Sequence, residues 1–420
     1  MRVLLCNNFV RGASGTDADV LIEERGLREL GHEVTLLRRD NTELDRAGPA
    51  RKAALLASSV YSMTTRRQVA SLLDGSRYDI AHVNNVVPLL TGSIYDACRG
   101  RCVTVHTLRN FRAVCPSSYL FRDGHPCDEC RRWAALPAVV HGCYRGSRLQ
   151  SAGLVAAHWV DRAKGRPLGH AADHYFAVSE HMRCRHAEWG IDPERISVVP
   201  NPAEDLGRLA DEARHAGGLA GDAGARAGIA GEPPGERARP VITYVGTLLE
   251  AKGVGRLLDL AAALPDFHFR FIGSGRDQEA LERRARRLRL ANVELCGFLA
   301  GAERVPRWAG SFLTAVPSLW EEPFGVIVPE SYSLGIPVVT TGTGGLAELV
   351  SDEVTGLIDG FWDIRALAAR LRALLADEAR YRAMQAAARE RYESGFTTRV
   401  FARNVERGFQ AALAAPGIIR

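Results

Sequence analysis

The stretch of sequence that decides the fold is PSLWEEPFGVIVPE, residues Pro317–Glu330. Two carboxylates in it, Glu322 and Glu330, are separated by seven residues, and a tight Pro-Phe-Gly turn follows the first. Pro329 suits the first turn of a helix, so we expect Glu330 at a helix N-terminus and Glu322 on the preceding loop. The free backbone N–H groups and the dipole at such a terminus attract anions. The stretch therefore predicts a pocket that can hold a diphosphate between two sets of sugar hydroxyls.

The pattern around this stretch decides between a binding site and a plain solvated turn. Gly335-Ile336-Pro337-Val338-Val339 reads as a turn into a buried strand, and Gly344-Gly345-Leu346-Ala347-Glu348 reads as a glycine loop that opens another helix. Thr355-Gly356-Leu357 follows. This ordered set resembles the nucleotide-sugar site of the retaining family-4 glycosyltransferases, which have the two-domain GT-B fold.

The alternation of short apolar segments and helical segments predicts the fold class independently. Strand candidates alternate with helices in the first half, and the pattern restarts at Pro240, so we expect an α/β protein with two Rossmann-like, doubly wound parallel sheets. The candidates are Arg2–Cys6, Glu33–Leu37, Ile80–Val83, Val103–Val105 and Tyr175–Val178, then Val241–Val245, Phe267–Ile272, Val293–Leu295, Phe312–Val316 and Val338–Thr340.

The domain organisation follows from this restart and from the resemblance. We expect an N-terminal acceptor-side domain over residues 1–203 and a C-terminal nucleotide-sugar-binding domain over 240–399. Residues 204–239 are rich in Ala, Gly, Arg and Glu and contain little large apolar content, which predicts an exposed, flexible linker. In the resembled fold, the two domains face each other across a cleft and a last helix crosses back to the first domain. The segment at about 400–415 is the candidate here.

Composition excludes several classes of protein. The 420-residue chain is 46% hydrophobic, but no run of about eighteen apolar residues could span a membrane. The N-terminus does not read as a signal peptide, which favours a cytoplasmic protein. The net charge of +5, from 54 basic and 49 acidic residues, is too small for a nucleic-acid-binding signature. It is compatible with an anionic ligand or with peripheral contact to a membrane surface.

Residues that follow strands in the second half carry the rest of the predicted donor site. Gly246 and Thr247 precede Lys252, and the resemblance implies that Lys252 neutralises the leaving diphosphate. Thr247 stands where the family usually has an arginine, which removes one cation. Gly273 begins a loop that lets backbone approach the donor, and the family counterpart of Phe298 contacts the base through its backbone.

The resemblance also assigns roles to the opening stretch. Glu330 is expected to bind ribose hydroxyls, and Glu322 is expected to bind the sugar together with the backbone of Phe324, Gly325, Val326 and Ile327. The implied donor is a nucleotide-diphosphate sugar of the UDP or GDP type. The implied reaction is transfer with retention by front-face attack, without a protein nucleophile and without a catalytic divalent metal.

The first half offers fewer specific candidates. Gly15 lies in a loop after the first strand that resembles the Gly-Gly-Thr-Glu loop of the family, where a backbone N–H touches the donor phosphate. His106 resembles the family histidine that lies beside the donor sugar. In an alternative register, set by the following Asn110-Phe111-Arg112, Arg109 replaces that histidine. A structural histidine is the plain alternative for His106.

Four cysteines, Cys115, Cys127, Cys130 and Cys143, gather within 29 residues, and two of them form a pair separated by two residues. Four thiolates at such spacing can hold a structural zinc ion. A bacterial subgroup of the resembled family has a similar cysteine-bearing insert. Reduced cysteines without metal are the alternative, because static disulfides are rare in the cytosol.

The sequence determines the identity of the acceptor less well than any other part of the predicted function. We expect a small-molecule acceptor, such as a natural product or a thiol metabolite. The alternatives are lipid-linked polysaccharide assembly, a nucleotide-sugar 2-epimerase and a non-catalytic binding protein with a decayed site. Membrane docking for lipid-linked polysaccharide assembly would need a basic amphipathic helix. Ala50–Leu73 is the candidate, although its charges are sparse.

Overall fold

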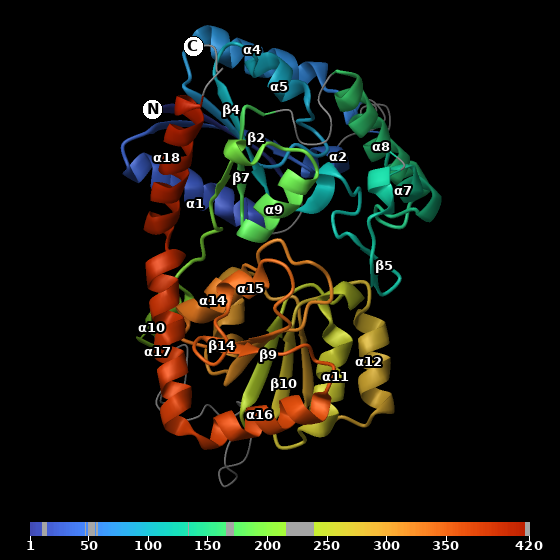
Figure 1. The fold of residues 1–420 in the computed structure, drawn as a ribbon, viewed down its shortest axis with the longest axis vertical. Helices are drawn as coiled ribbons and strands as arrows, with labels where there is room; N and C mark the ends of the chain where they lie inside the picture. Colours follow the sequence, from blue (N-terminus) through green and yellow to red (C-terminus); the bar gives the residue numbers. More distant parts are fainter. Residues whose placement is uncertain are drawn as a thin grey trace. The chain divides into compact units, whose positions relative to one another are not determined.

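The computed structural model describes residues 1–10, 15–46, 48, 55, 58–132, 134–164, 172–215 and 239–415. The chain forms two compact units, each built around its own parallel sheet (Figure 1). Unit 1 comprises Met1–Asn201 together with Thr398–Arg420, and unit 2 comprises Pro202–Thr397. The α/β fold class with two doubly wound sheets is therefore confirmed.

Unit 1 contains a six-stranded parallel sheet of order β2-β1-β3-β4-β7-β8. Its central strands are short and almost wholly buried, as expected for a parallel sheet covered on both faces. In β1, Val3 is paired with Val34 on one side and with Ile80 on the other. The strands are β1 (Arg2–Phe9), β2 (Glu33–Asp40), β3 (Ile80–Val83), β4 (Val103–Leu108), β7 (His174–Ala177) and β8 (Ile196–Val198).

Helices of unit 1 begin where the sequence supplies capping side chains. The Ser147 hydroxyl accepts a hydrogen bond from the Gln150 N–H, and the Ser179 hydroxyl accepts one from the Met182 N–H. The helices are α1 (Gly15–Glu29), α2 (Thr42–Asp45), α4 (Met63–Gly75), α5 (Ser93–Cys98), α6 (Glu129–Arg132), α7 (Leu136–His141), α8 (Arg148–Ala163) and α9 (Glu180–Glu188). The described part of unit 1 also contains the 3₁₀ turns η1 (Phe111–Ala113) and η2 (Pro193–Arg195).

The last helix, α18 (Thr398–Ala414), belongs to unit 1, although it follows unit 2 in the sequence. Its side chains Phe401, Val405, Phe409 and Ala412 are buried in the same core as β1, β3 and β4. The Phe409 ring stacks on Phe176 of β7, with ring centroids 5.6 Å apart. Helix α18 is thus part of the hydrophobic core of unit 1.

Unit 2 contains a second six-stranded parallel sheet, of order β11-β10-β9-β12-β13-β14. Apolar side chains of β9, β10 and β12 pack against α11, α16 and α17 in the largest core of the unit. The strands are β9 (Val241–Val245), β10 (His268–Ile272), β11 (Val293–Gly297), β12 (Leu313–Val316), β13 (Val338–Thr340) and β14 (Gly356–Ile358). The helices are α10 (Leu206–His215), α11 (Val254–Ala263), α12 (Gln278–Arg287), α13 (Val305–Trp308), α14 (Ile327–Ser333), α15 (Leu346–Leu349), α16 (Ile364–Ala376) and α17 (Glu378–Gly395), with η3 (Glu250–Lys252) and η4 (Gly301–Arg304).

The structure differs from the sequence-based expectation in several elements. The three-residue strands β8 and β14 and the small hairpin β5 (Phe121–Arg122) and β6 (His125–Pro126) were not expected. Such strands are too short to show an alternating pattern, so their formation depends on the neighbouring strands of the sheet.

The expected linker 204–239 begins with helix α10, in which Leu206 and Ala210 are buried against α13 and α14. Residues 216–238 of that linker lie outside the described residues. Within the described parts of the chain, no helix has both the length and the apolar character needed to cross a membrane.

The packing of α18 against β7 gives a prediction about stability. A Cβ atom at Gly408 would lie 2.4 Å from a ring carbon of Phe176. Gly408→Val should therefore lower the free energy of unfolding of unit 1 by about 1–3 kcal/mol, through overpacking. A matched control is Gly395→Ala in α17, where the nearest atom would lie 3.8 Å away. Equal denaturation midpoints for the two variants would contradict this account of the core.

Candidate functional site

The predicted donor residues of unit 2 lie on loops that follow the carboxyl ends of its strands. Gly246 follows β9, Gly273 follows β10 and the stretch Pro317–Glu330 follows β12. Because the strands are parallel, their carboxyl ends meet at one edge of the sheet, which is where open α/β sheets bind ligands. The fold therefore brings these sequence-distant loops to one edge.

Glycines allow these loops to approach each other backbone to backbone. Gly273 has a φ of +150°, and a Cβ atom there would lie 1.9 Å from the Gly246 carbonyl oxygen. A Cβ atom at Gly275 would lie 2.2 Å from the Leu248 carbonyl oxygen. The Leu248 N–H donates to the Ser274 carbonyl oxygen at 3.0 Å. Any side chain at these two glycines would separate the loops.

Lys252 ends the 3₁₀ turn η3, and this turn is docked on the stretch that follows β12. The Leu319 N–H donates to the Ala251 carbonyl oxygen at 2.8 Å. Gly253, with a φ of +71°, comes so close that a Cβ atom would lie 1.8 Å from the Pro317 carbonyl oxygen. This contact fixes the position of the Lys252 side chain relative to Glu322.

The Glu322 carboxylate accepts four hydrogen bonds. Lys252 Nζ lies 2.8 Å from each of its two oxygens. The Ser318 hydroxyl donates to Oε2 at 2.9 Å, and the Trp320 Nε1–H donates to the same oxygen at 2.8 Å. Lys252 Nζ also lies 4.8 Å from the centre of the Trp320 ring, within the range of a cation–π contact. A buried carboxylate is stable only with such partners, and here all of them come from nearby loops.

The glycine loop of the sequence motif supports the backbone of this carboxylate. The Gly345 N–H donates to the Glu322 carbonyl oxygen at 2.7 Å. A Cβ atom at Gly344 would lie 2.4 Å from the same oxygen, and Gly325 has a φ of +97° that favours glycine. The two glycine positions of the motif are therefore explained by close backbone contact around Glu322.

Glu330 lies in the first turn of α14, as the sequence predicted, although the helix begins at Ile327, two residues before Pro329. Its side chain is 14% exposed and pairs with Arg304, which ends η4. Burial raises the pKa of the Glu330 carboxyl, and the Arg304 guanidinium opposes that rise. Sequence reasoning missed Arg304, Ser318 and Trp320, since no motif marks Arg304 and the other two read as turn residues.

The remaining predicted residues of unit 2 flank these loops. The Thr247 carbonyl oxygen accepts a hydrogen bond from the Tyr244 hydroxyl at 2.7 Å. Phe298 follows β11 and is 61% exposed, an unusual state for a large aromatic side chain. The backbone of Val326 caps α14, and Phe324 is buried.

In unit 1, Gly15 is the first residue of α1, and residues 11–14 of its loop lie outside the described residues. His106 lies on β4, where its Nδ1 is 2.8 Å from the Tyr95 hydroxyl and its ring packs edge-on against Tyr175. Burial lowers the pKa of His106 to about 3, so the imidazole is neutral at pH 7. These contacts are those of a packed, hydrogen-bonded histidine.

Arg109, the alternative to His106, lies just beyond β4 in a buried polar network. Its Nη1 donates to Asp19 Oδ2 at 2.7 Å and to Asn201 Oδ1 at 2.6 Å. Its Nε and Nη2 both donate to Asn84 Oδ1. The network ties α1 to the carboxyl ends of three strands. Arg109 therefore holds this edge of the first sheet together.

The four clustered cysteines are free thiols in unit 1. Cys130 and Cys143 pack against the apolar side chains of Ala135, Ala138 and Val155. Burial and the nearby thiols of Cys115, Cys143 and Cys127 raise the pKa of the Cys130 thiol to about 12. Across the residues that the structure describes, no three His, Cys, Asp or Glu side chains form a group that could hold a metal ion. The zinc prediction for Cys115, Cys127, Cys130 and Cys143 thus receives no support.

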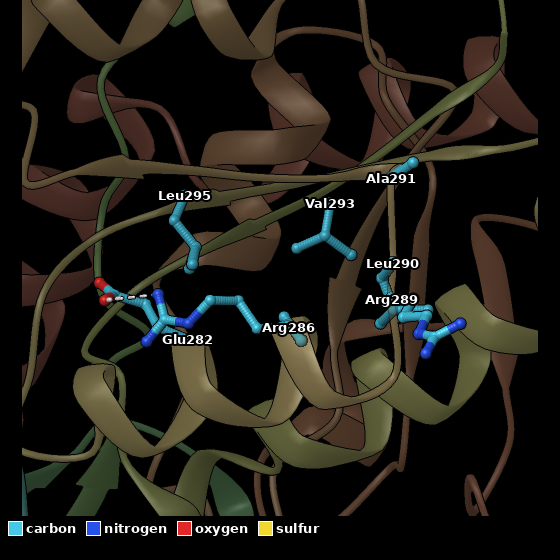
Figure 2. Close-up of a pocket in the computed structure, with 8 residues that line it drawn as sticks. Glu282, Arg286, Arg289, Leu290, Ala291, Val293 and Leu295 are labelled. Atoms are coloured by element: carbon cyan, nitrogen blue, oxygen red, sulfur yellow. Dashed lines mark ion pairs between the residues drawn. The ribbon is translucent and has the colours of Figure 1, made fainter.

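A shallow pocket of about 310 Å³ lies away from the predicted donor residues, between α12 and β11 (Figure 2). Leu290, Val293 and Leu295 form its apolar part, and Glu282 and Arg286 pair at its edge. None of the predicted donor residues lines it.

Comparisons with known proteins agree with the two-unit architecture. The model of the family described as Glycosyltransferase Family 4 matches residues 23–205, and that of Glycosyl transferases group 1 matches residues 232–391. D-inositol 3-phosphate glycosyltransferase of Segniliparus rotundus is 31% identical over 205 residues, which is 47% of this chain and 42% of that protein. A GDP-mannose-dependent phosphatidylinositol monomannoside mannosyltransferase of Mycolicibacterium smegmatis is 31% identical over 55% of this chain and 60% of that protein. The matches thus span less than two thirds of these relatives.

Solved structures resemble this chain over almost its whole length. Sucrose-phosphate synthase from Thermosynechococcus elongatus has a TM-score of 0.67 at 18% identity, covering 98% of this chain and 99% of that one. Anabaena Alr3699/HepE in complex with UDP has a TM-score of 0.65 at 18% identity, covering 98% and 100%. The chain thus contains a segment that matches Glycosyltransferase Family 4, followed by one that matches Glycosyl transferases group 1, and it has the fold of the GT-B glycosyltransferases.

Proposed function

We propose that this protein is a retaining glycosyltransferase that transfers a sugar from a nucleoside-diphosphate sugar to a small-molecule acceptor. The observation that carries the proposal is the Lys252–Glu322 ion pair, in which Glu322 is buried and Lys252 is partly exposed, held by glycine-rich loops at the carboxyl edge of the second sheet. An ammonium beside backbone N–H groups suits a diphosphate, and carboxylates suit sugar hydroxyls. Relatives named as glycosyltransferases and a similar fold in complex with UDP-glucose support this choice.

The donor roles follow from the chemistry of the side chains. An ammonium has three N–H donors, and Glu322 takes two of those of Lys252, which leaves one for a diphosphate oxygen. Its charge then stabilises the negative charge that develops on the leaving diphosphate. Glu330 accepts from ribose hydroxyls. Glu322 together with the Phe324–Ile327 backbone binds the sugar, and a sugar hydroxyl there takes the place of one of the four hydrogen bonds that the Glu322 carboxylate now accepts. Gly15, Gly246, Thr247, Gly273 and Phe298 are proposed to border the donor, and His106 or Arg109 to contribute from unit 1.

The proposed reaction needs no protein nucleophile and no catalytic metal. The bond between the anomeric carbon and the diphosphate oxygen breaks, and the acceptor hydroxyl forms the new bond on the same face. The acceptor proton passes to the departing diphosphate oxygen. The protein contributes binding, orientation and charge stabilisation, which suffice when the leaving group itself acts as the base.

The acceptor is proposed to be a small molecule with a free hydroxyl or thiol. The name of one relative, for D-inositol 3-phosphate, is consistent with a small acceptor. A relative that acts on a phosphatidylinositol monomannoside keeps lipid-linked acceptors as the second candidate. A 2-epimerase and a non-catalytic binding protein remain the alternatives outside this reaction class.

The stereochemical outcome tests the proposed reaction. Purified protein is incubated with UDP- and GDP-sugars and a panel of small acceptors, and the anomeric configuration of the product is read by proton NMR. We expect transfer with the configuration of the donor. An inverted product would exclude retention, and an epimerised sugar formed without any acceptor would identify an epimerase.

The role of Glu330 is tested by donor affinity. Glu330→Ala removes two hydroxyl acceptors, so calorimetry should show nucleotide affinity reduced by about 2 kcal/mol or more, roughly 30-fold. Glu330→Gln keeps one hydrogen-bond acceptor and the side-chain volume but removes the negative charge that pairs with Arg304. Comparison with Glu330→Ala therefore separates the loss of hydroxyl binding from the loss of the ion pair. Glu378→Gln, on the exposed start of α17, is the matched control. Unchanged nucleotide affinity in both Glu330 variants would remove this residue from the donor site.

Trp320 is predicted to act through Lys252 and Glu322 as a positioning residue. Trp320→Phe keeps a ring near Lys252 but loses the hydrogen bond to Glu322, so kcat should fall about tenfold with a smaller change in KM. Trp320→Leu also loses the ring and should approach the kcat of Lys252→Ala. Trp362→Phe, at an exposed tryptophan, is the control. Wild-type kinetics for Trp320→Phe, at an unchanged melting temperature, would refute the positioning role.

A further inference from the structure

Helices α7 and α8 of unit 1 carry exposed apolar side chains that the donor site does not use. Ten large hydrophobic side chains are prominently exposed in the part of the chain that the structure describes, and four of them fall on these two helices. They are Leu136 at 47%, Val140 at 62%, Leu149 at 83% and Trp159 at 45% exposure. We call these four side chains and the basic residues around them the α7–α8 surface.

The two helices pack side by side, so the four apolar side chains belong to one region (Figure 1). At one end, Arg148 Nε donates to the Val140 carbonyl oxygen at 3.1 Å, which places Val140 beside Arg148 and Leu149. At the other end, Trp159 Nε1 donates to the Ala134 carbonyl oxygen at 2.9 Å, close to the start of α7. Their inward side chains Ala138 and Val155 form a small core of their own.

Helix α8 is apolar on its outer side as well as its inner side. From Gln150 to Val160 the sequence contains no Lys, Arg, Asp or Glu. A surface helix of a globular protein normally carries charges on the face that meets water. Its charges here lie at the two ends, with Arg148 at the start and Arg162 and Lys164 at the finish.

The charge of this region is mainly positive, and of its basic side chains Lys164 pairs with Asp96 at 3.5 Å. Residues 131–164 contain six Lys or Arg and one Asp, an excess equal to the +5 of the whole chain. Arg131, Arg145, Arg148, Arg162 and Lys164 are exposed. The single acid, Asp161, is partly buried near Gly92. The surface thus combines exposed apolar side chains with an unbalanced positive charge.

We propose that the α7–α8 surface docks on a lipid bilayer that contains anionic phospholipids. Basic side chains are attracted to anionic headgroups, while Leu, Val and Trp enter the boundary between headgroups and acyl chains. Nucleic acid would use the charge but leave the aliphatic side chains exposed to water. A second copy across a two-fold axis would set basic residues against basic residues.

This surface differs from the one that sequence patterning suggested. Ala50–Leu73 was the candidate for a docking helix, but its described part shows one large exposed apolar side chain, Met63. The proposal does not rest on the identity of the donor or the acceptor. Docking would hold unit 1 at the bilayer, where a membrane-borne acceptor is available.

The test is co-sedimentation of the full chain with vesicles. Vesicles of phosphatidylcholine alone are compared with vesicles in which about a third of the lipid is phosphatidylglycerol. We expect binding only to the anionic vesicles, weakened by raised salt because exposed charges are screened. Equal binding to both vesicle types, or no binding to either, would overturn the proposal.

Variants assign the binding to the surface. Leu149→Gln combined with Val140→Gln, and separately Arg145→Gln combined with Arg162→Gln, should each reduce anionic vesicle binding at least tenfold. Leu288→Gln combined with Arg287→Gln is the matched control, since it removes one exposed leucine and one exposed arginine from unit 2. Loss of binding in the control alone would move the docking site to unit 2. A dimer in analytical ultracentrifugation that Leu149→Gln dissociates, without vesicle binding by the wild type, would instead assign the surface to a second copy.

Discussion

The buried carboxylate of Glu322 is the group on which the candidate site depends. The three side chains that donate its four hydrogen bonds come from η3 and from the stretch after β12. One carboxylate thus joins two loops that are about seventy residues apart. An isolated carboxylate in this position would be costly to bury, and an isolated Lys252 would lose its fixed position. The Lys252 ammonium therefore lowers the cost of burying the Glu322 carboxylate, and the carboxylate fixes the position of the ammonium. A binding site can form around the pair without large rearrangement.

The glycines of unit 2 give this pair its geometry. At Gly253, Gly273 and Gly344 a side chain would strike a backbone atom of a neighbouring loop, so the loops meet through their main chains. Main-chain contact at the carboxyl edge of a parallel sheet leaves little freedom for Lys252 or Glu322 to drift. The same loops are proposed to leave N–H groups for a diphosphate, which links the packing of the unit to its chemistry.

Unit 1 is stabilised differently. Its sheet edge is held by buried polar side chains, with Arg109 joining Asp19, Asn84 and Asn201, and its core is completed by α18 from the far end of the chain. This arrangement makes the strand ends rigid and leaves α7 and α8 as an apolar, basic periphery. Docking of the α7–α8 surface on a bilayer would hold unit 1 at the membrane.

The sequence by itself determined the two parallel sheets, because apolar runs of four to eight residues between helical segments allow few other folds. Its ordered motifs, through their resemblance to a known family, also marked Lys252, Glu322 and Glu330 as a set, since glycine turns and a proline in the first turn of a helix are local signals. Only the tertiary structure decided β8, β14 and α10, whose short or polar segments are fixed by neighbours rather than by pattern. The sequence likewise did not reveal the partners Arg304 and Trp320, the hydrogen bond of His106 to Tyr95 or the exposed face of α8. Each depends on which side chains the fold brings together or leaves uncovered, and that is a property of long-range packing rather than of local sequence.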